Sequence, residues 1–111
     1  MIFVDFLGSK SAFESLQEGV AEEIAAALRS SRSSVVIRRM VVDPEPTEIE
    51  LWVELSSDEQ FVRYGRTIAE RVAERIRADG SSDVWVMFRI VPLSHAFLNG
   101  QPRARGRATL D

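Results

Sequence analysis

The chain has 111 residues, 45% hydrophobic and 28% charged, which predicts one folded domain and excludes a disordered or low-complexity protein. It has no cysteine and one histidine, which excludes disulfides, thiolate metal sites and a cysteine nucleophile and argues against a histidine zinc site. The net charge of -3 argues against nucleic acid as a partner, and the absence of a long apolar stretch or basic leader favours a cytoplasmic protein without a membrane anchor.

The first half of the chain predicts a strand, a helix and a second strand. Residues 1–7 are rich in β-branched and aromatic side chains, which is typical of a strand. Ser11 and Glu14 have the spacing of a capping box, and apolar residues follow at helical spacing to Leu28, so a helix is expected to begin at Ser11. Residues 35–42 are mostly β-branched and predict the second strand.

The second half of the chain repeats this order after a turn with two prolines at residues 43–46. Residues 49–55 alternate apolar side chains with mostly acidic ones, which predicts a strand with one buried face. Residues 57–60 have the pattern of a second capping box, and an apolar stripe after them predicts a helix that Gly80 ends. Residues 83–91 predict a fourth strand with apolar side chains on both faces, which suits a central or interface position.

Two consecutive β-α-β units, each expected to be a right-handed crossover with parallel strands, are compatible with more than one fold. A ferredoxin-like split β-α-β arrangement has the same element order as a duplicated β-α-β unit, so periodicity does not separate them. A ferredoxin-like regulatory or nucleic-acid-binding module would need basic and aromatic residues on its exposed sheet face. Acidic residues line the third strand instead, namely Glu48, Glu50 and Glu54.

Two short segments carry a resemblance to a known family. Residues 91–100, VPLSHAFLNG, are similar to the segment that closes the β-α-β unit in 4-oxalocrotonate tautomerases, where a short turn, an aromatic residue and a glycine follow the second strand. Residues 54–60, ELSSDEQ, resemble that family's junction between first strand and helix. As a whole, residues 2–102 resemble trimeric proteins of unknown function in the tautomerase superfamily, whose monomers carry two such units.

The resemblance implies an α+β (two-layer) fold in which two β-α-β units form a four-stranded sheet with two helices on one face. It also implies a homotrimer in which the opposite face of the sheet meets neighbouring subunits. The domain boundaries expected from it are 1–102 for a single tautomerase-like domain, 1–43 and 47–102 for its two units, and 103–111 for a basic C-terminal tail.

The activity that the resemblance implies is keto–enol tautomerisation of small 2-oxo or enol acids without a cofactor or metal, with an N-terminal proline as general base. This chain departs from that pattern, because Ile2 follows Met1 and so large a side chain normally blocks removal of the initiator methionine. The expected base is therefore the primary amine of Met1, with Ile2 beside the substrate. At most a weak isomerase is predicted, and the alternative is a non-catalytic trimeric protein that binds a ligand or another protein.

An anionic substrate needs cationic partners, and the candidates are Lys10, Arg32, Arg38 and Arg39. The resemblance implies a basic residue at Lys10 and a carboxylate-binding arginine at one of the adjacent pair on the second strand. A guanidinium suits this role because its planar fork donates two parallel hydrogen bonds to a carboxylate and can stabilise an enolate. Adjacent strand residues point to opposite faces, so only one of the pair is expected to face the pocket. The alternative is that one of the pair is solvated and the other bridges subunits through a carboxylate such as Glu50 or Glu54.

Phe97 resembles the aromatic residue that forms a wall of the pocket in the family, and the alternative role for it is an anchor in a subunit interface. The pair Asn99-Gly100 favours a type I′ turn, which predicts that residues 92–102 fold back as a hairpin.

Overall fold

The structure, a computed structural model, describes residues 1–78 and 83–103. Its first unit consists of β1 (Ile2–Leu7), α1 (Lys10–Leu28), a short 3-10 turn η1 (Arg32–Ser34) and β2 (Val35–Arg39). Its second unit consists of β3 (Ile49–Leu55), α2 (Asp58–Arg77) and β4 (Val84–Ile90). A short 3-10 turn η2 (Leu93–His95) and a hairpin of β5 (Phe97–Leu98) and β6 (Gln101–Pro102) follow.

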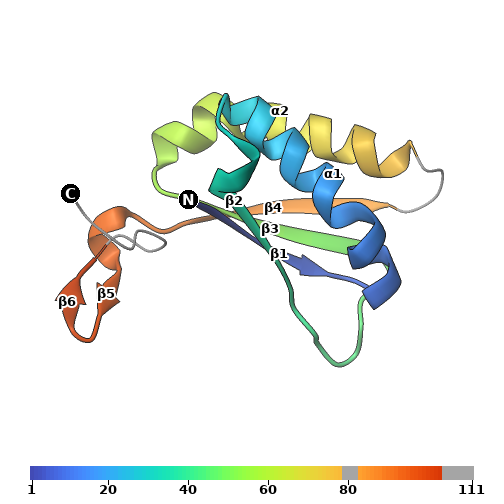
Figure 1. Ribbon diagram of the computed structural model, residues 1–111, viewed down its shortest axis with the longest axis horizontal. Coiled ribbons are helices and arrows are strands. Elements are labelled where there is room, and N and C mark those ends of the chain that lie inside the picture. The colour runs from blue at the N-terminus through green and yellow to red at the C-terminus, as the bar shows by residue number, and fades with distance from the viewer. Residues whose placement is uncertain (79–82, 104–111) are drawn as a thin grey trace.

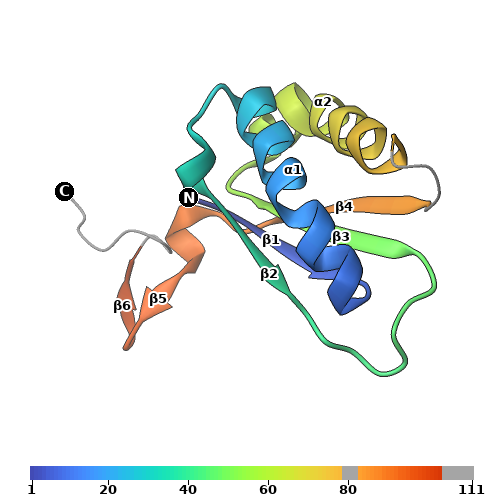
Figure 2. The same cartoon turned by 45° about the vertical axis from the view of Figure 1, so that its right-hand side comes forward.

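The four long strands form one mixed sheet in the order β2-β1-β3-β4. β1 and β2 are parallel, β3 and β4 are parallel, and the antiparallel pair of β1 with β3 joins the two units. Both helices lie on one face of this sheet (Figures 1 and 2). The predicted fold class, with two β-α-β units and two helices on one face, is confirmed.

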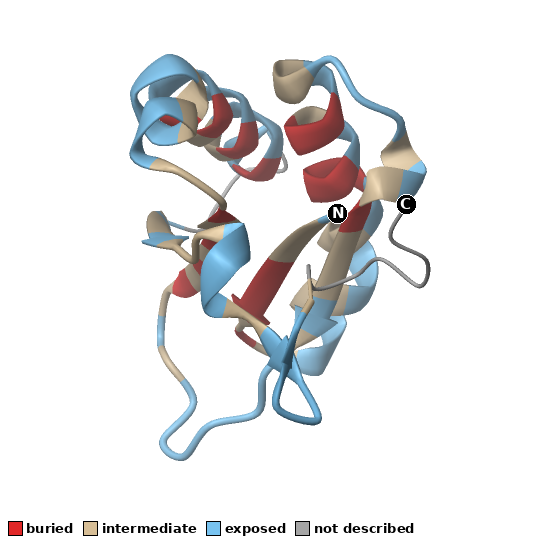
Figure 3. Cartoon of the chain, turned by 90° about the vertical axis from the view of Figure 1, so that its left-hand side faces the viewer, coloured by how far each residue is buried: buried red, intermediate tan, exposed pale blue. Residues whose placement is uncertain are grey.

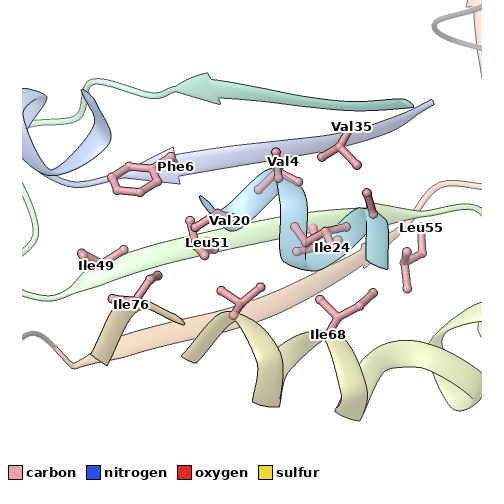
Figure 4. Packing of buried hydrophobic residues seen from close by; sticks show 14 residues of the cluster. Val4, Phe6, Val20, Ile24, Val35, Ile49, Leu51, Leu55, Ile68 and Ile76 are labelled. Atoms are coloured by element: carbon pink, nitrogen blue, oxygen red, sulfur yellow. The ribbon is translucent and has the colours of Figure 1, made fainter. Parts of the chain in front are cut away.

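The core lies between the sheet and the two helices, and the buried parts of both layers face each other there (Figure 3). Every second residue of β3 is buried, as the alternation in the sequence predicted. Figure 4 shows these side chains meeting the apolar stripes of α1 and α2. The largest fully buried side chains are Phe6, Ile24, Leu51, Leu55 and Ile68.

The start of α1 differs from the prediction. Ser9, not Ser11, is the N-cap residue, and its hydroxyl oxygen accepts a hydrogen bond from the Ala12 amide over 3.0 Å. The chain leaves β1 at Leu7 and turns immediately, so Ser9 is the first hydroxyl that can reach an orphan amide of the helix. The predicted capping box at Ser11 and Glu14 is therefore wrong.

The cap of α2 agrees with the prediction. The Ser57 hydroxyl accepts a hydrogen bond from the Gln60 amide over 3.1 Å. The Gln60 side chain accepts from the amide of Ser56 rather than from that of Ser57. The helix ends at Arg77, and the predicted stop at Gly80 lies outside the described residues.

The second strand is shorter than predicted. It ends at Arg39, and residues 40–42 are exposed instead of continuing the ladder. Strand β1, its partner, ends at Leu7. The Met40 amide donates to the Phe6 carbonyl, and within residues 1–78 and 83–103 no backbone partner follows for residues 41 and 42. β-branched residues alone do not extend a strand where the neighbouring strand has ended.

The predicted hairpin after the fourth strand is present, with Phe97 opposite Pro102 and Leu98 opposite Gln101. Asn99 and Gly100 both have positive φ angles, 54° and 79°, as a type I′ turn requires. The hairpin projects away from the two layers at one end of the sheet (Figures 1 and 2).

Candidate functional site

A cavity of about 200 Å³ lies where the start of β1 meets the ends of β3 and β4. These ends meet because β3 and β4 run antiparallel to β1, and Figure 2 shows the N-terminus close to the chain segment that leaves β4. We call this space the Met1 cavity. Its lining comprises Met1, Ile2, Phe3, Glu54, Leu55, Ser56, Gln60, Val91, Pro92, Leu93 and Ala96.

The size of the Met1 cavity limits what can enter it. Liquid water takes about 30 Å³ per molecule, so the space corresponds to roughly seven waters. Pockets for drug-sized ligands are larger, about 300 to 1,000 Å³. The Met1 residue is 56% exposed, so it stands at the opening. The cavity therefore suits a small organic molecule that enters past the chain's first residue.

The first turn of α2 fixes the polar side of the cavity. The Gln60 Oε1 atom accepts hydrogen bonds from the Ser56 amide over 2.8 Å and from the Ser56 hydroxyl over 3.0 Å. These bonds hold Gln60 against the junction between β3 and α2, and within the described chain its Nε2 group donates to no protein acceptor. Glu54, Ser56 and Gln60 thus supply the polar side chains of the lining, and its other side chains are apolar.

Of the predicted site residues, Met1 and Ile2 line the cavity together, but the predicted cations do not. Lys10 is the first residue of α1, exposed, and follows the far end of β1. Arg32 lies before β2 and forms a bidentate pair with Glu18, with distances of 2.8 Å and 3.0 Å, and also donates to the Val35 carbonyl. This pairing holds the pKa of the Glu18 carboxyl below its usual value.

The two adjacent arginines of β2 point to different places. The Nε of Arg39 donates to the Gly8 carbonyl over 3.3 Å, and its Nη2 pairs with Glu45 over 3.4 Å. Arg38 lies on the sheet face away from the helices and pairs with Asp5 over 3.1 Å. Neither residue lines the Met1 cavity of its own chain.

Phe97 is 63% exposed on the hairpin and is also absent from the cavity lining. Leu93 of the preceding turn lines the cavity instead. The exposure of Phe97 is compatible with both of its expected roles, the wall of a pocket completed by another copy of the chain and an anchor in a subunit interface.

A charge cluster on the open face of the sheet was not predicted. The Asp5 side chain is only 8% exposed and accepts hydrogen bonds from Arg38 of β2 and Arg89 of β4. Burial raises the pKa of the Asp5 carboxyl, but the hydrogen bonds from Arg89 and Arg38 outweigh this and lower it below the usual value. The guanidinium of Arg89 also stacks over Trp52, so the cluster crosses all four strands.

The sequence contains a partial signal for this cluster. Alternation in β1 places Asp5 on the same face as two apolar neighbours, where an unpaired carboxylate would be costly. The arginine partners of Asp5 lie 33 and 84 residues away in the sequence, so they can be identified only once the strand order is known.

In the part of the chain that the structure describes, no three histidine, aspartate or glutamate side chains are grouped so that they could hold a metal ion. Among the same residues, neither long helix carries an apolar stretch that could cross a bilayer.

No protein-family model matches the chain, and no curated protein matches it in sequence. Solved structures do match. A protein of unknown function from Vibrio cholerae is 18% identical, with a TM-score of 0.72 over 91% of this chain and 86% of that one. An asymmetric trimer of fused 4-OT is 17% identical, with a TM-score of 0.68 over 95% and 99%.

A macrophage migration inhibitory factor-like protein from Entamoeba histolytica is 4% identical, with a TM-score of 0.63 over 90% of this chain and 95% of that one. These likenesses cover 90% or more of this chain at identities of 18% or less, so they establish the architecture and not an activity. The chain therefore has the fold of the tautomerase superfamily.

Proposed function

We propose that the protein is a cofactor-independent keto–enol tautomerase of weak activity, with the primary amine of Met1 as general base. The observation that carries this proposal is the position of Met1 in the lining of a cavity of about 200 Å³. A terminal amine at this position would contact a bound ligand, whereas a terminal amine on an open surface of the protein contacts only water.

The chemistry needs one base and one site for the developing charge. The unprotonated amine of Met1 takes a proton from the carbon next to the ligand's carbonyl, the enolate forms, and the ammonium returns the proton to oxygen or carbon. The Gln60 amide nitrogen stands in the same lining and is the side-chain donor available to the enolate oxygen, because the Ser56 hydroxyl already donates its one proton to Gln60 Oε1. This donor is neutral, and the base is a primary amine, so the expected rate is low.

The proposal includes a homotrimer, a cytoplasmic location and an isomerase reaction. Support for the trimer comes from the fused 4-OT structures, which are described as trimers and share this architecture. The sheet adds a second argument, because it has two parallel strand pairs but helices on only one face. Parallel sheets are usually covered on both faces, and copies of the same chain can cover the open one.

A second candidate is a trimer that binds a small molecule or a protein without catalysis. The observation that favours it is that the described lining of the Met1 cavity contains no lysine or arginine to stabilise an enolate. The predicted cations would reach the cavity only from another copy.

The test measures ketonisation of phenylenolpyruvate by the native chain and by two variants. In one variant Ile2→Pro is combined with removal of Met1, which mass spectrometry confirms. In the other, two residues precede Met1 and move the amine away from the cavity. A low native rate that the extension abolishes and the proline raises supports tautomerisation. If native and extended chains have equal rates, Met1 is not the base, and inactivity of all three favours the binding role.

A further inference from the structure

We infer that Ser56 is a positioning residue that holds the carboxamide of Gln60 with its nitrogen turned to the Met1 cavity, and that Gln60 thereby selects ligands with a ketone oxygen. This inference rests on the proposed function, in which Gln60 is the donor to the developing enolate. It adds the residue that fixes this donor and the ligand group that the donor recognises.

The orientation of the Gln60 carboxamide follows from its partners. The backbone amide of Ser56 lies 2.8 Å from one end of the carboxamide and can only donate a hydrogen bond, so that end is the oxygen. The Ser56 hydroxyl donates to the same oxygen over 3.0 Å. A flipped carboxamide would place its own N–H groups against the N–H of Ser56, which excludes the opposite orientation.

The nitrogen at the other end of the carboxamide is accessible to a ligand. Within residues 1–78 and 83–103, Nε2 of Gln60 donates to no protein acceptor. No buried side-chain nitrogen or oxygen of the same residues lacks a hydrogen-bond partner, so Nε2 is open to the cavity or to solvent rather than sealed in the interior. Gln60 is half-buried and belongs to the cavity lining, so a ligand in the cavity meets this nitrogen.

The cap of α2 does not use this nitrogen. Gln60, the third residue of the helix, contributes to the cap through its backbone amide, which donates to the Ser57 hydroxyl over 3.1 Å, and through Oε1. A glutamate would serve the cap equally, because a carboxylate oxygen also accepts from Ser56 and glutamate is a usual third residue of a capping box. The cap and the recognition of a ligand can therefore be separated by substitution.

A donor held in this way discriminates between ligands by their acceptor. A ketone oxygen accepts a hydrogen bond from Nε2, whereas a methylene group at the same place leaves the donor desolvated and without a partner. Because Ser56 fixes the carboxamide before the ligand binds, the side chain loses less rotational freedom on binding. The cavity is therefore expected to prefer a ketone to the matching compound without the ketone oxygen.

The test compares benzoylformate with phenylacetate, which carry the same charge and differ by a ketone oxygen in place of two hydrogens. Benzoylformate has no hydrogen on a saturated carbon beside its ketone, so it cannot be tautomerised and its binding is measured without turnover. Calorimetry on the full chain in its native assembly gives both affinities. The native chain is expected to bind benzoylformate about fivefold more tightly than phenylacetate, as one neutral hydrogen bond allows.

Two substitutions of Gln60 separate the roles of its two ends. Gln60→Glu keeps an oxygen for Ser56 but has no N–H to donate, and Gln60→Met, of similar length, has neither group. In both variants the preference for benzoylformate should fall below about twofold, since the donor is lost. Urea unfolding should show lower stability for Gln60→Met only. The ratio of the two affinities cancels the charge that glutamate adds, because both ligands carry one carboxylate.

Substitutions of Ser56 test its positioning role. Ser56→Ala removes one of the two hydrogen bonds that hold Oε1 and leaves Nε2 in place, so the preference should fall to about half its native value. Ser56→Thr keeps a hydroxyl and should restore the native preference. A Ser56→Ala chain that loses stability but keeps the native preference would show that Ser56 supports the helix alone, and would overturn the positioning role.

The outcomes separate this inference from the proposed function. Equal affinity of the native chain for the two ligands overturns the inference, and so does a preference that survives in both Gln60 variants or a failure of both ligands to bind. Each of these outcomes leaves the role of the Met1 amine to its own test. That role fails separately, when the native and extended chains turn over phenylenolpyruvate at equal rates.

Discussion

Asp5 of β1 and Arg38 of β2 are register partners in the parallel pair, and the Arg38 Nη2 group donates to Asp5 Oδ1 over 3.1 Å. A second guanidinium, that of Arg89, donates to the other oxygen of the same carboxylate from β4, which is the edge strand opposite β2. The carboxylate of one central strand thus holds groups from both edge strands, which ties the two β-α-β units together on the face that carries no helix.

Replacing Asp5 by asparagine is expected to lower the unfolding free energy at neutral pH by about 1 to 3 kcal/mol, since two guanidinium groups lose their charged partner. The pKa of Asp5 is lowered in the folded protein, so this stability is present above about pH 4 and is lost as pH falls through the folded pKa. Denaturant titrations from pH 7 to pH 2 should therefore show native and Asp5→Asn chains converging in stability.

The control for this prediction is Glu70→Gln, which changes an exposed carboxylate on α2. It should lower stability little at any pH. A constant gap between native and Asp5→Asn chains down to pH 2 would contradict the coupling of Asp5 ionisation to folding.

The sequence predicted the order of the long elements because each has a clear period. The alternation in residues 49–55 and the apolar stripe of α2 depend only on local spacing, and both appear in the structure as predicted. Features that depend on which strands are neighbours in the sheet were not predicted. The end of β2 at Arg39 is set by where β1 stops, and the partners of Asp5 are set by the strand order.

The candidate site was predictable only in part, for the same reason. A terminal residue at the start of a first strand can be expected at a sheet end, and Met1 lines the cavity there. Lys10 and Arg39 are close to the same strands in sequence, but both follow the opposite strand ends, roughly 20 Å away at about 3.3 Å per residue. The cavity's polar side comes from Ser56 and Gln60, which the sequence marked only as part of a helix cap.

The two serines at the start of α1, Ser9 at its N-cap and Ser11 in its first turn, provide a direct test of the cap. Ser9→Ala removes the hydroxyl that accepts from the Ala12 amide and should cost about 1 kcal/mol of stability. Ser11→Ala is the matched control, because Ser11 is exposed inside the first turn and alanine is a good helix former there. Urea unfolding of both variants should show a lower unfolding free energy for Ser9→Ala only. A larger decrease for Ser11→Ala would instead support the capping box of Ser11 and Glu14 that the sequence predicted.

The contact between the two helices includes a carboxylate shared by two arginines. Glu23, 19% exposed, accepts from Arg71 over 3.1 Å and from Arg75 over 2.9 Å. Glu23→Gln should lower stability by about 0.5 to 1 kcal/mol at low salt and by less at 1 M salt, where ion pairs are screened. Thermal unfolding at both salt concentrations measures this difference.

Glu22→Gln is the control for Glu23→Gln, since Glu22 is half exposed and, among the described residues, bonds to Arg75 alone. It should lower the unfolding temperature less than Glu23→Gln does. Equal effects of the two substitutions, or an effect of Glu23→Gln that does not depend on salt, would show that the shared carboxylate is not what joins the helices.

A substitution in the turn of the β5–β6 hairpin tests whether this projecting segment folds independently of the core. Gly100 has a φ of 79°, and nothing lies within 4 Å of the place where a Cβ would stand, so Gly100→Ala is strained but not crowded. The expected cost is about 1 kcal/mol, confined to the hairpin because its strands bury no core residue. Hydrogen exchange at the Arg103 amide, which donates to the Ala96 carbonyl over 2.9 Å, should accelerate, while global unfolding stays unchanged. Asn99→Gly, which keeps a residue tolerant of positive φ, should leave that exchange rate close to the native value or slow it, and unchanged protection of Arg103 in Gly100→Ala would show that the turn does not hold the hairpin.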